Sequence, residues 1–222
     1  MDEKFSNLLQ TARCQLKRGI SQTSRLKMTY PEFIELFKIR GYQTIIEHKK
    51  NDMFMIDDNN IEVINLMYDY VSFNESTINP HIGILLNGNW GCGKSILIET
   101  FCKILSDVSN TEPIQVIHAI DLAEQIRING VSPFIRKPLC IQDIGKEPVE
   151  VTSWGTKINP LTNLLAIRAE YGELTFGSMN IGFKTFEKTY QEFIAKRIKD
   201  YVHFICLKGE SRRKDYSINQ PK

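Results

Sequence analysis

The chain of 222 residues lacks most of the features that mark secreted, metal-binding and membrane proteins. Its five cysteines form neither a C-x-x-C pair nor a cluster with histidine, so the sequence offers no zinc site and no disulfide framework. It contains no apolar run of membrane-spanning length and no apolar signal segment near its first residue. The formal net charge is only +2, which does not by itself indicate nucleic-acid binding. We therefore expect a reduced, cytoplasmic protein without a membrane segment.

A glycine-rich stretch between two apolar segments gives the clearest indication of function. Residues 88–95 match the pattern G-x-x-x-x-G-K-[ST]. An apolar segment at 82–86 has the length of a buried strand, and apolar residues recur at helical spacing from 97 to 105. Strand, loop and helix in this order predict a phosphate-binding loop. The loop residues are Gly88, Asn89, Trp90, Gly91, Cys92, Gly93, Lys94 and Ser95.

The residue types in this loop suit the binding of a nucleoside triphosphate. Glycine permits backbone angles that direct successive N–H groups into one concavity, and a helix N-terminus favours anions there. We expect Lys94 to reach the β- and γ-phosphate oxygens and the Ser95 hydroxyl to ligate Mg²⁺. A chance match in a glycine-rich turn is the alternative, and the flanking strand and helix argue against it.

Predicted strands and helices alternate beyond the loop. The alternation predicts an α/β fold with a parallel sheet covered by helices on both faces. Asp143 and Asn180 each follow a predicted strand, at the edge where such sheets bind their ligands. We expect Asp143 to hold the Mg²⁺ shell and to position an attacking water, the alternative being a simple turn residue before Gly145. The later strands are predicted at 114–118, 138–143, 174–178 and 202–207, and the later helices at 121–128, 160–172 and 183–194.

The first 75 residues contain no group suited to catalysis and are predicted to form a small, mainly helical region. Thr29 and Glu32 predict a capping box at the start of a helix that Gly41 ends. A short strand is expected at 53–56, followed by an amphipathic helix at 63–71.

We divide the chain into three parts on this basis. The basic residues within 1–28 either contact nucleic acid or an acidic partner, or form a solvated surface. The predicted parts are a partner-binding or adaptor region at 1–75, a nucleotide-binding domain at 76–214 and a C-terminal tail at 215–222.

Four segments of the chain support a more specific interpretation. They are Gly83–Ser95, Gln142–Pro148, Ser178–Asn180 and Gly209–Lys214. Together, and in this order, they resemble the DnaC/IstB type of AAA+ ATPases, which are replicative helicase loaders and transposition helper proteins. The resemblance extends over residues 60–214 and implies a P-loop NTPase fold of the AAA+ type, with ATP and Mg²⁺ as ligands. It also implies that Asn180 orients the attacking water and that Arg197 contacts the γ-phosphate in its own subunit.

Two positions depart from the pattern of that family. Gln142 stands where the family usually has the first of two acidic residues, which helps to hold Mg²⁺. Phe193 stands where the family tends to have an arginine finger that reaches the nucleotide of a neighbouring subunit, and Lys196 is a candidate substitute. An arginine finger contributes roughly 10³–10⁵ in rate in related systems, so we expect a slow ATPase.

Several functions are compatible with these observations. The first is an ATPase that loads or remodels a replicative helicase or another DNA-bound protein machine. The second is an ATP-locked adaptor or sensor that does not hydrolyse ATP, and an IstB-like transposition helper is a further alternative. A small-molecule kinase is disfavoured because no arginine-rich insert precedes Asp143. We expect weak, salt-sensitive binding of single-stranded DNA and an oligomer that forms only with the partner or with DNA.

Overall fold

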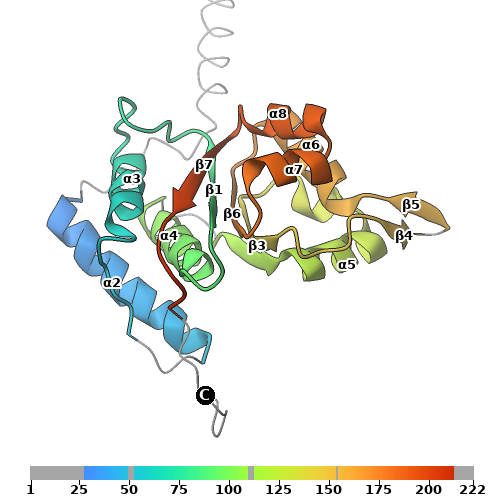
Figure 1. Ribbon diagram of the computed structural model, residues 1–222. Helices are drawn as coiled ribbons and strands as arrows, with labels where there is room; N and C mark the ends of the chain where they lie inside the picture. Colours follow the sequence, from blue (N-terminus) through green and yellow to red (C-terminus); the bar gives the residue numbers. More distant parts are fainter. Residues whose placement is uncertain (1–27, 50–52, 110–112, 154, 213–222) are drawn as a thin grey trace, which may run out of the picture.

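A parallel five-stranded sheet forms the centre of the molecule and carries helices on both faces (Figure 1). The structure is a computed structural model, and it describes residues 28–49, 53–109, 113–153 and 155–212. The strand order is β2-β3-β6-β1-β7, and all neighbouring strands run parallel to each other. The strands of the sheet are β1 (Gly83–Gly88), β2 (Gln115–His118), β3 (Leu139–Ile144), β6 (Thr175–Met179) and β7 (Val202–Leu207). The predicted α/β architecture is therefore confirmed.

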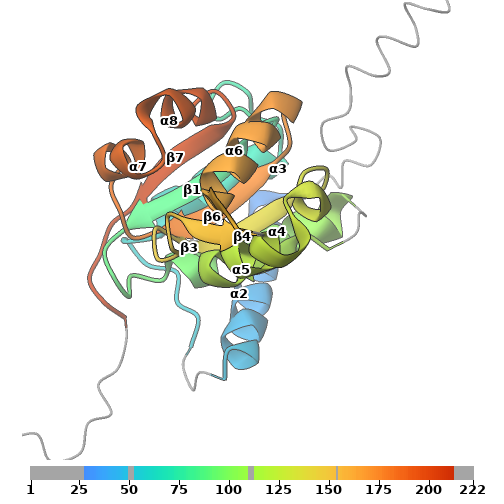
Figure 2. The same cartoon turned by 90° about the vertical axis from the view of Figure 1, so that its right-hand side faces the viewer.

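The helices divide into two groups, one on each face of the sheet. The first group contains α2 (Tyr30–Glu47), α3 (Ile61–Val71) and α4 (Lys94–Ser109). The second contains α5 (Ala119–Asn129), α6 (Pro160–Tyr171), α7 (Phe183–Thr189) and α8 (Glu192–Ile198). Figure 2 looks onto the face that this second group covers. Two short elements were not expected from the sequence: the antiparallel hairpin of β4 (Val151–Ser153) and β5 (Thr156–Ile158), and the 3-10 helix Ser132–Phe134.

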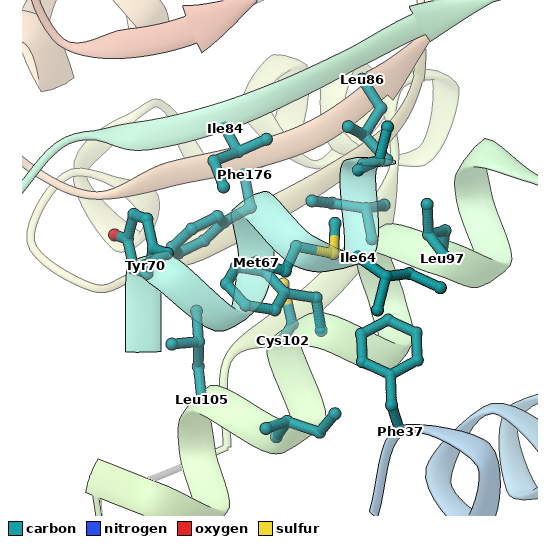
Figure 3. Packing of buried hydrophobic residues seen from close by; sticks show 14 of the residues in the cluster. Phe37, Ile64, Met67, Tyr70, Ile84, Leu86, Leu97, Cys102, Leu105 and Phe176 are labelled. Atoms are coloured by element: carbon teal, nitrogen blue, oxygen red, sulfur yellow. The ribbon is translucent and has the colours of Figure 1, made fainter. Parts of the chain in front are cut away.

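The alternation of side chains along β1 builds two separate cores. Ile84 and Leu86 point into the cluster beneath α2, α3 and α4, whereas Leu85 points into the cluster beneath α5, α6, α7 and α8. Figure 3 shows the first cluster, in which Phe37 of α2 and Met67 of α3 pack with residues of α4. The helices before β1 therefore share a core with the helix that follows the glycine-rich loop.

The predictions for the N-terminal part have mixed outcomes. The helix begins as predicted, because the backbone N–H of Thr29 donates a 2.7 Å hydrogen bond to the Glu32 carboxylate. The prediction that Gly41 ends this helix is wrong, since α2 continues to Glu47. A Cβ atom at Gly41 would lie 2.5 Å from Cγ of Phe54, so the glycine makes room for that ring. The predicted strand at 53–56 is also wrong, because these residues are irregular and place Phe54 against α2.

One predicted helix is in fact two. The segment 183–194 breaks between α7 and α8, at Gln191, which has a positive φ of 67°. The preceding Tyr190 is buried, and its hydroxyl donates a hydrogen bond to the carboxylate of Glu147. The buried Tyr190 side chain anchors the chain where α7 ends, and the backbone turns at the next residue. The helical spacing of the apolar residues gives no sign of this break. The basic residues of 1–27 and the tail after 212 lie outside the described residues, and the domain boundary near residue 76 stays a prediction.

Candidate nucleotide-binding site

The loop between β1 and α4 has the backbone of a phosphate cradle. Gly88, Gly91 and Gly93 have φ angles of 146°, 78° and 103°, which side chains disfavour. A Cβ atom would also lie 2.3 Å from the Leu207 carbonyl oxygen at Gly88 and 2.2 Å from Oγ of Ser211 at Gly91. The loop ends where α4 begins, so the N-terminus of a 16-residue helix faces the concavity.

Lys94 is held tightly within this loop. Its Nζ atom donates hydrogen bonds to the carbonyl oxygens of Gly88 and Asn89, at 2.9 and 2.7 Å. Only 4% of the residue is exposed, and burial lowers the pKa of Lys94. The ammonium group is thus pre-positioned at the loop, where the sequence predicts its phosphate contacts.

A β-bulge near the end of β3 positions Asp143. The register between β3 and β6 shifts between Ile141 and Ile144, and Asp143 has a φ of 59°. Bulges are common next to active sites, where they redirect a side chain. The Asp143 backbone N–H donates to Oγ of Ser178 at 3.1 Å, and the same Oγ lies 3.1 Å from Oγ of Ser95. Ser178 therefore connects the loop serine to the bulge.

Three polar groups surround the Asp143 carboxylate. Nδ2 of Asn180 donates to Oδ1 at 3.1 Å, Nζ of Lys146 donates to Oδ2 at 2.7 Å, and Nδ1 of His118 lies 4.0 Å from Oδ2. Burial alone would raise the pKa of Asp143, but the hydrogen bonds from Lys146 and Asn180 outweigh it and hold the pKa below its usual value. The predicted pair of Asp143 and Asn180 is in direct contact.

Gln142 points away from this carboxylate, into the contact between β3 and α4. Its Nε2 donates a 2.7 Å hydrogen bond to the carboxylate of Glu99 on α4, which also accepts one from His48 at 2.8 Å and pairs with Lys103 at 3.3 Å. Gln142 is 1% exposed and Glu99 is 7% exposed. Burial would raise the pKa of Glu99, but these partners outweigh it and lower the pKa. The amide therefore serves as a buried donor to a carboxylate.

Replacing Gln142 with aspartate is expected to destabilise the fold without increasing turnover. The new carboxylate would face Glu99 without a donor between them, which should cost about 3 kcal/mol. In a chain of this size such a loss lowers the melting temperature by about 6–12 °C. Thermal unfolding measures it, with Gln142→Asn as the neutral control. A fully stable aspartate variant with faster turnover would show that position 142 belongs to the metal site.

The structure does not bring Arg197 to the loop. Its Nη1 lies 2.9 Å from Oε1 of Glu170, at the end of α6 that precedes β6. Figure 1 shows α8 beside the start of β7, whereas the glycine-rich loop follows the end of β1. Phe193 is 75% exposed. Lys196 forms an exposed pair with Glu192 at 2.6 Å.

Two cations near the loop were missing from the predicted site. The Arg212 backbone N–H donates to the Gly91 carbonyl oxygen at 2.9 Å, its Nε donates to the Cys92 carbonyl oxygen at 3.2 Å, and its Nη2 donates to Asp57 at 2.7 Å. Lys146, beside Asp143, is the second. In the sequence, only the position of Lys146 and Arg212 within the family-like segments pointed to the site. Their contacts depend on the path of the chain after β3 and after β7, which brings each residue back to the loop.

The chain is similar to known proteins in part of its sequence and in its fold. The KAP family P-loop domain matches residues 60–161. Among solved structures, the DnaC helicase loader superposes with a TM-score of 0.56 at 13% identity, over 71% of this chain and 95% of that one. The chain has the P-loop NTPase fold. The resemblance to DnaC-type helicase loaders stated from the sequence is thereby confirmed at the level of the fold.

Two further solved structures superpose with lower TM-scores. A primosome component from Streptococcus pyogenes serotype M3 has 20% identity and a TM-score of 0.49, over 71% of this chain and 84% of that one. DnaI has 19% identity and a TM-score of 0.49, over 73% of this chain and 88% of that one. No curated protein matches the chain. In the part of the chain that the structure describes, every helix is too short or too polar to span a membrane.

Proposed function

We propose that the protein binds ATP with Mg²⁺ at the glycine-rich loop, hydrolyses it slowly, and acts as a loader of a replicative helicase or of another DNA-bound machine. The observation that carries this proposal is the convergence of three chain segments at one edge of the sheet. Ser178 joins Ser95 of the loop to the Asp143 bulge, and Asn180 contacts the Asp143 carboxylate. A phosphate-binding loop and a residue that orients the attacking water are among the parts that ATP hydrolysis uses.

Each residue has a distinct part in this proposal. The loop N–H groups and Lys94 bind the β- and γ-phosphates, because a buried ammonium and a helix N-terminus both favour anions. Asp143 orients a water molecule and accepts its proton as the water oxygen bonds to the γ-phosphorus, while the bond from that phosphorus to the bridging oxygen breaks and ADP leaves. Asn180 holds the Asp143 carboxylate in place.

The residues present also fit Mg²⁺. This ion usually takes one or two protein ligands and obtains the others from phosphates and water. Among the described residues, no cluster of three or more His, Cys, Asp or Glu side chains forms a cage for a metal. Ser95 and Asp143, linked through Ser178, would hold such an ion, which neutralises charge on the phosphates.

Slow turnover is expected because position 193, where the arginine finger would stand, carries no positive charge. Phe193 is exposed but carries no charge that could stabilise a transferring phosphoryl group, and Arg197 is paired with Glu170. We assign the partner contact to residues 1–75, within which α2 exposes three apolar side chains at helical spacing. These are Ile39, Tyr42 and Ile46.

Introducing an arginine at position 193 should therefore make turnover depend on protein concentration. The wild-type protein alone should be monomeric with ATP and equally slow at every concentration. The variant Phe193→Arg would supply a finger only across a subunit boundary, so its specific activity should rise with concentration, by up to about 10³-fold. The variant Phe193→Ala is the control, because it removes the ring without adding charge.

Phosphate release is measured over a range of protein concentrations, with and without helicase and single-stranded DNA. A wild-type protein whose specific activity already climbs steeply without either ligand would show that another residue supplies the finger.

An ATP-locked adaptor is the second candidate. The observation that favours it is the 2.7 Å contact between Lys146 and Asp143, which occupies the carboxylate needed to orient water. In that case no phosphate is released in a single-turnover assay, even with helicase and single-stranded DNA, although ATP binds. An IstB-like helper would instead respond to a transposase.

A further inference from the structure

Lys146 lies where the predicted catalytic carboxylate meets the glycine-rich loop. Its Nζ is 2.7 Å from Oδ2 of Asp143 and 4.8 Å from the centroid of the Trp90 ring. Trp90 belongs to the loop and is 59% exposed. Lys146 therefore contacts both the Asp143 carboxylate and a residue of the glycine-rich loop.

The backbone around Lys146 is firmly held, so its side chain starts from a defined position. Its N–H donates to the Asp143 carbonyl oxygen at 3.2 Å, which closes a tight turn. Gly145 has a φ of 96°, and its N–H donates to Oε2 of Glu147 at 2.8 Å. Glu147 is buried and also accepts the hydroxyl hydrogen of Tyr190. Only the flexible lysine stem is free to move, and 31% of the Lys146 side chain is exposed.

An ordinary exposed ion pair would not support a functional role, because such pairs contribute only about 0–1 kcal/mol. The pair of Lys146 and Asp143 differs from such surface pairs because both residues have further contacts at the predicted site. Its carboxylate is the one that Asn180 also contacts, and its lysine also lies over a residue of the glycine-rich loop. Burial lowers the pKa of Lys94, and the positive charge of Lys146 adds to this effect. An anion at the loop would be attracted by both ammonium groups.

We propose that Lys146 senses the γ-phosphate: it binds Asp143 until a triphosphate occupies the loop, then moves to the γ-phosphate and releases the carboxylate. The inference rests on the proposed ATP binding and adds a regulation of that site. A diphosphate has no group at this position, so Lys146 would stay on Asp143. A γ-phosphate competes well for the ammonium because it offers several charged acceptor oxygens. The same lysine would supply, within one subunit, part of the positive charge that Phe193 cannot provide.

The test compares a triphosphate with a diphosphate in a chain that has one tryptophan. The protein contains two tryptophans, so Trp154→Phe leaves Trp90 as the reporter. Affinities for ATPγS and ADP are measured by calorimetry, and Trp90 emission is recorded with each. We expect ATPγS to change the emission more than ADP does, because only the triphosphate draws Lys146 away from the ring.

The variant Lys146→Met should then weaken ATPγS binding by about 10–100-fold, the effect of one charge-assisted hydrogen bond. Its ADP affinity should stay within about twofold of the unmodified chain, which corresponds to less than 0.5 kcal/mol. The variant Lys146→Arg should keep the preference for the triphosphate. Lys157→Met, at an exposed lysine of β5, is the matched control and should change neither affinity.

Equal losses for both nucleotides in Lys146→Met, or an unchanged preference, would overturn the inference and leave the proposed function standing. A wild-type protein that binds neither nucleotide overturns the proposed function, and the inference with it.

Discussion

Replacing Lys94 with alanine should lower the affinity for ATP by at least about a hundredfold, because two charge-assisted hydrogen bonds to phosphate are worth roughly 3–6 kcal/mol together. The loop backbone supplies the shape of the cradle, whereas Lys94 supplies its buried charge. The variant should remain folded, since the removed ammonium donates its hydrogen bonds to the loop itself, at Gly88, Asn89 and Cys92. Calorimetric titration with ATP measures the affinity.

The control for this variant is Lys157→Ala, which removes an exposed lysine paired with Glu150 on the β4–β5 hairpin. Its ATP affinity and its melting temperature should match those of the wild type. Near-normal ATP binding by a folded Lys94→Ala protein would show that the nucleotide, if it binds at all, binds elsewhere.

Replacing Asp143 with asparagine should abolish most turnover and leave ATP binding nearly intact. The amide has almost the same shape but cannot accept a proton, and a positioned base contributes about 10²–10⁴ in rate. The affinity should change by less than about fivefold, or 1 kcal/mol, because the loop and Lys94 are untouched. Single-turnover phosphate release at saturating ATP measures the effect.

Asp200→Asn is the matched control for Asp143→Asn. Asp200 is exposed in the turn before β7, at the edge of the sheet opposite to the loop. Its turnover should equal that of the wild type. If Asp143→Asn also retains full turnover, Asp143 is a turn residue and the proposed mechanism fails.

The sequence alone was sufficient to predict those features whose physical cause lies in neighbouring residues or in a repeating pattern. Glycine spacing predicted the loop, because glycine is the residue that readily adopts the positive φ angles found at Gly88, Gly91 and Gly93. Alternating apolar segments predicted the parallel sheet, and parallel strands necessarily bring their carboxyl ends to one edge. That geometry is why Asp143 and Asn180, 37 positions apart in the sequence, could be expected to meet.

Only the tertiary structure decided which partner each polar side chain has. Gln142 and Asp143 are neighbours in sequence, yet one contacts Glu99 on α4 and the other contacts Asn180 and Lys146 at the predicted nucleotide site, because successive residues of a strand point to opposite sides. Arg197 matched a family position but pairs with Glu170, and Arg212 contacts the loop although the sequence had not placed it at the nucleotide site. Such partners lie many residues away, so they depend on how the helices pack against the sheet, which the spacing of residues along the chain does not record.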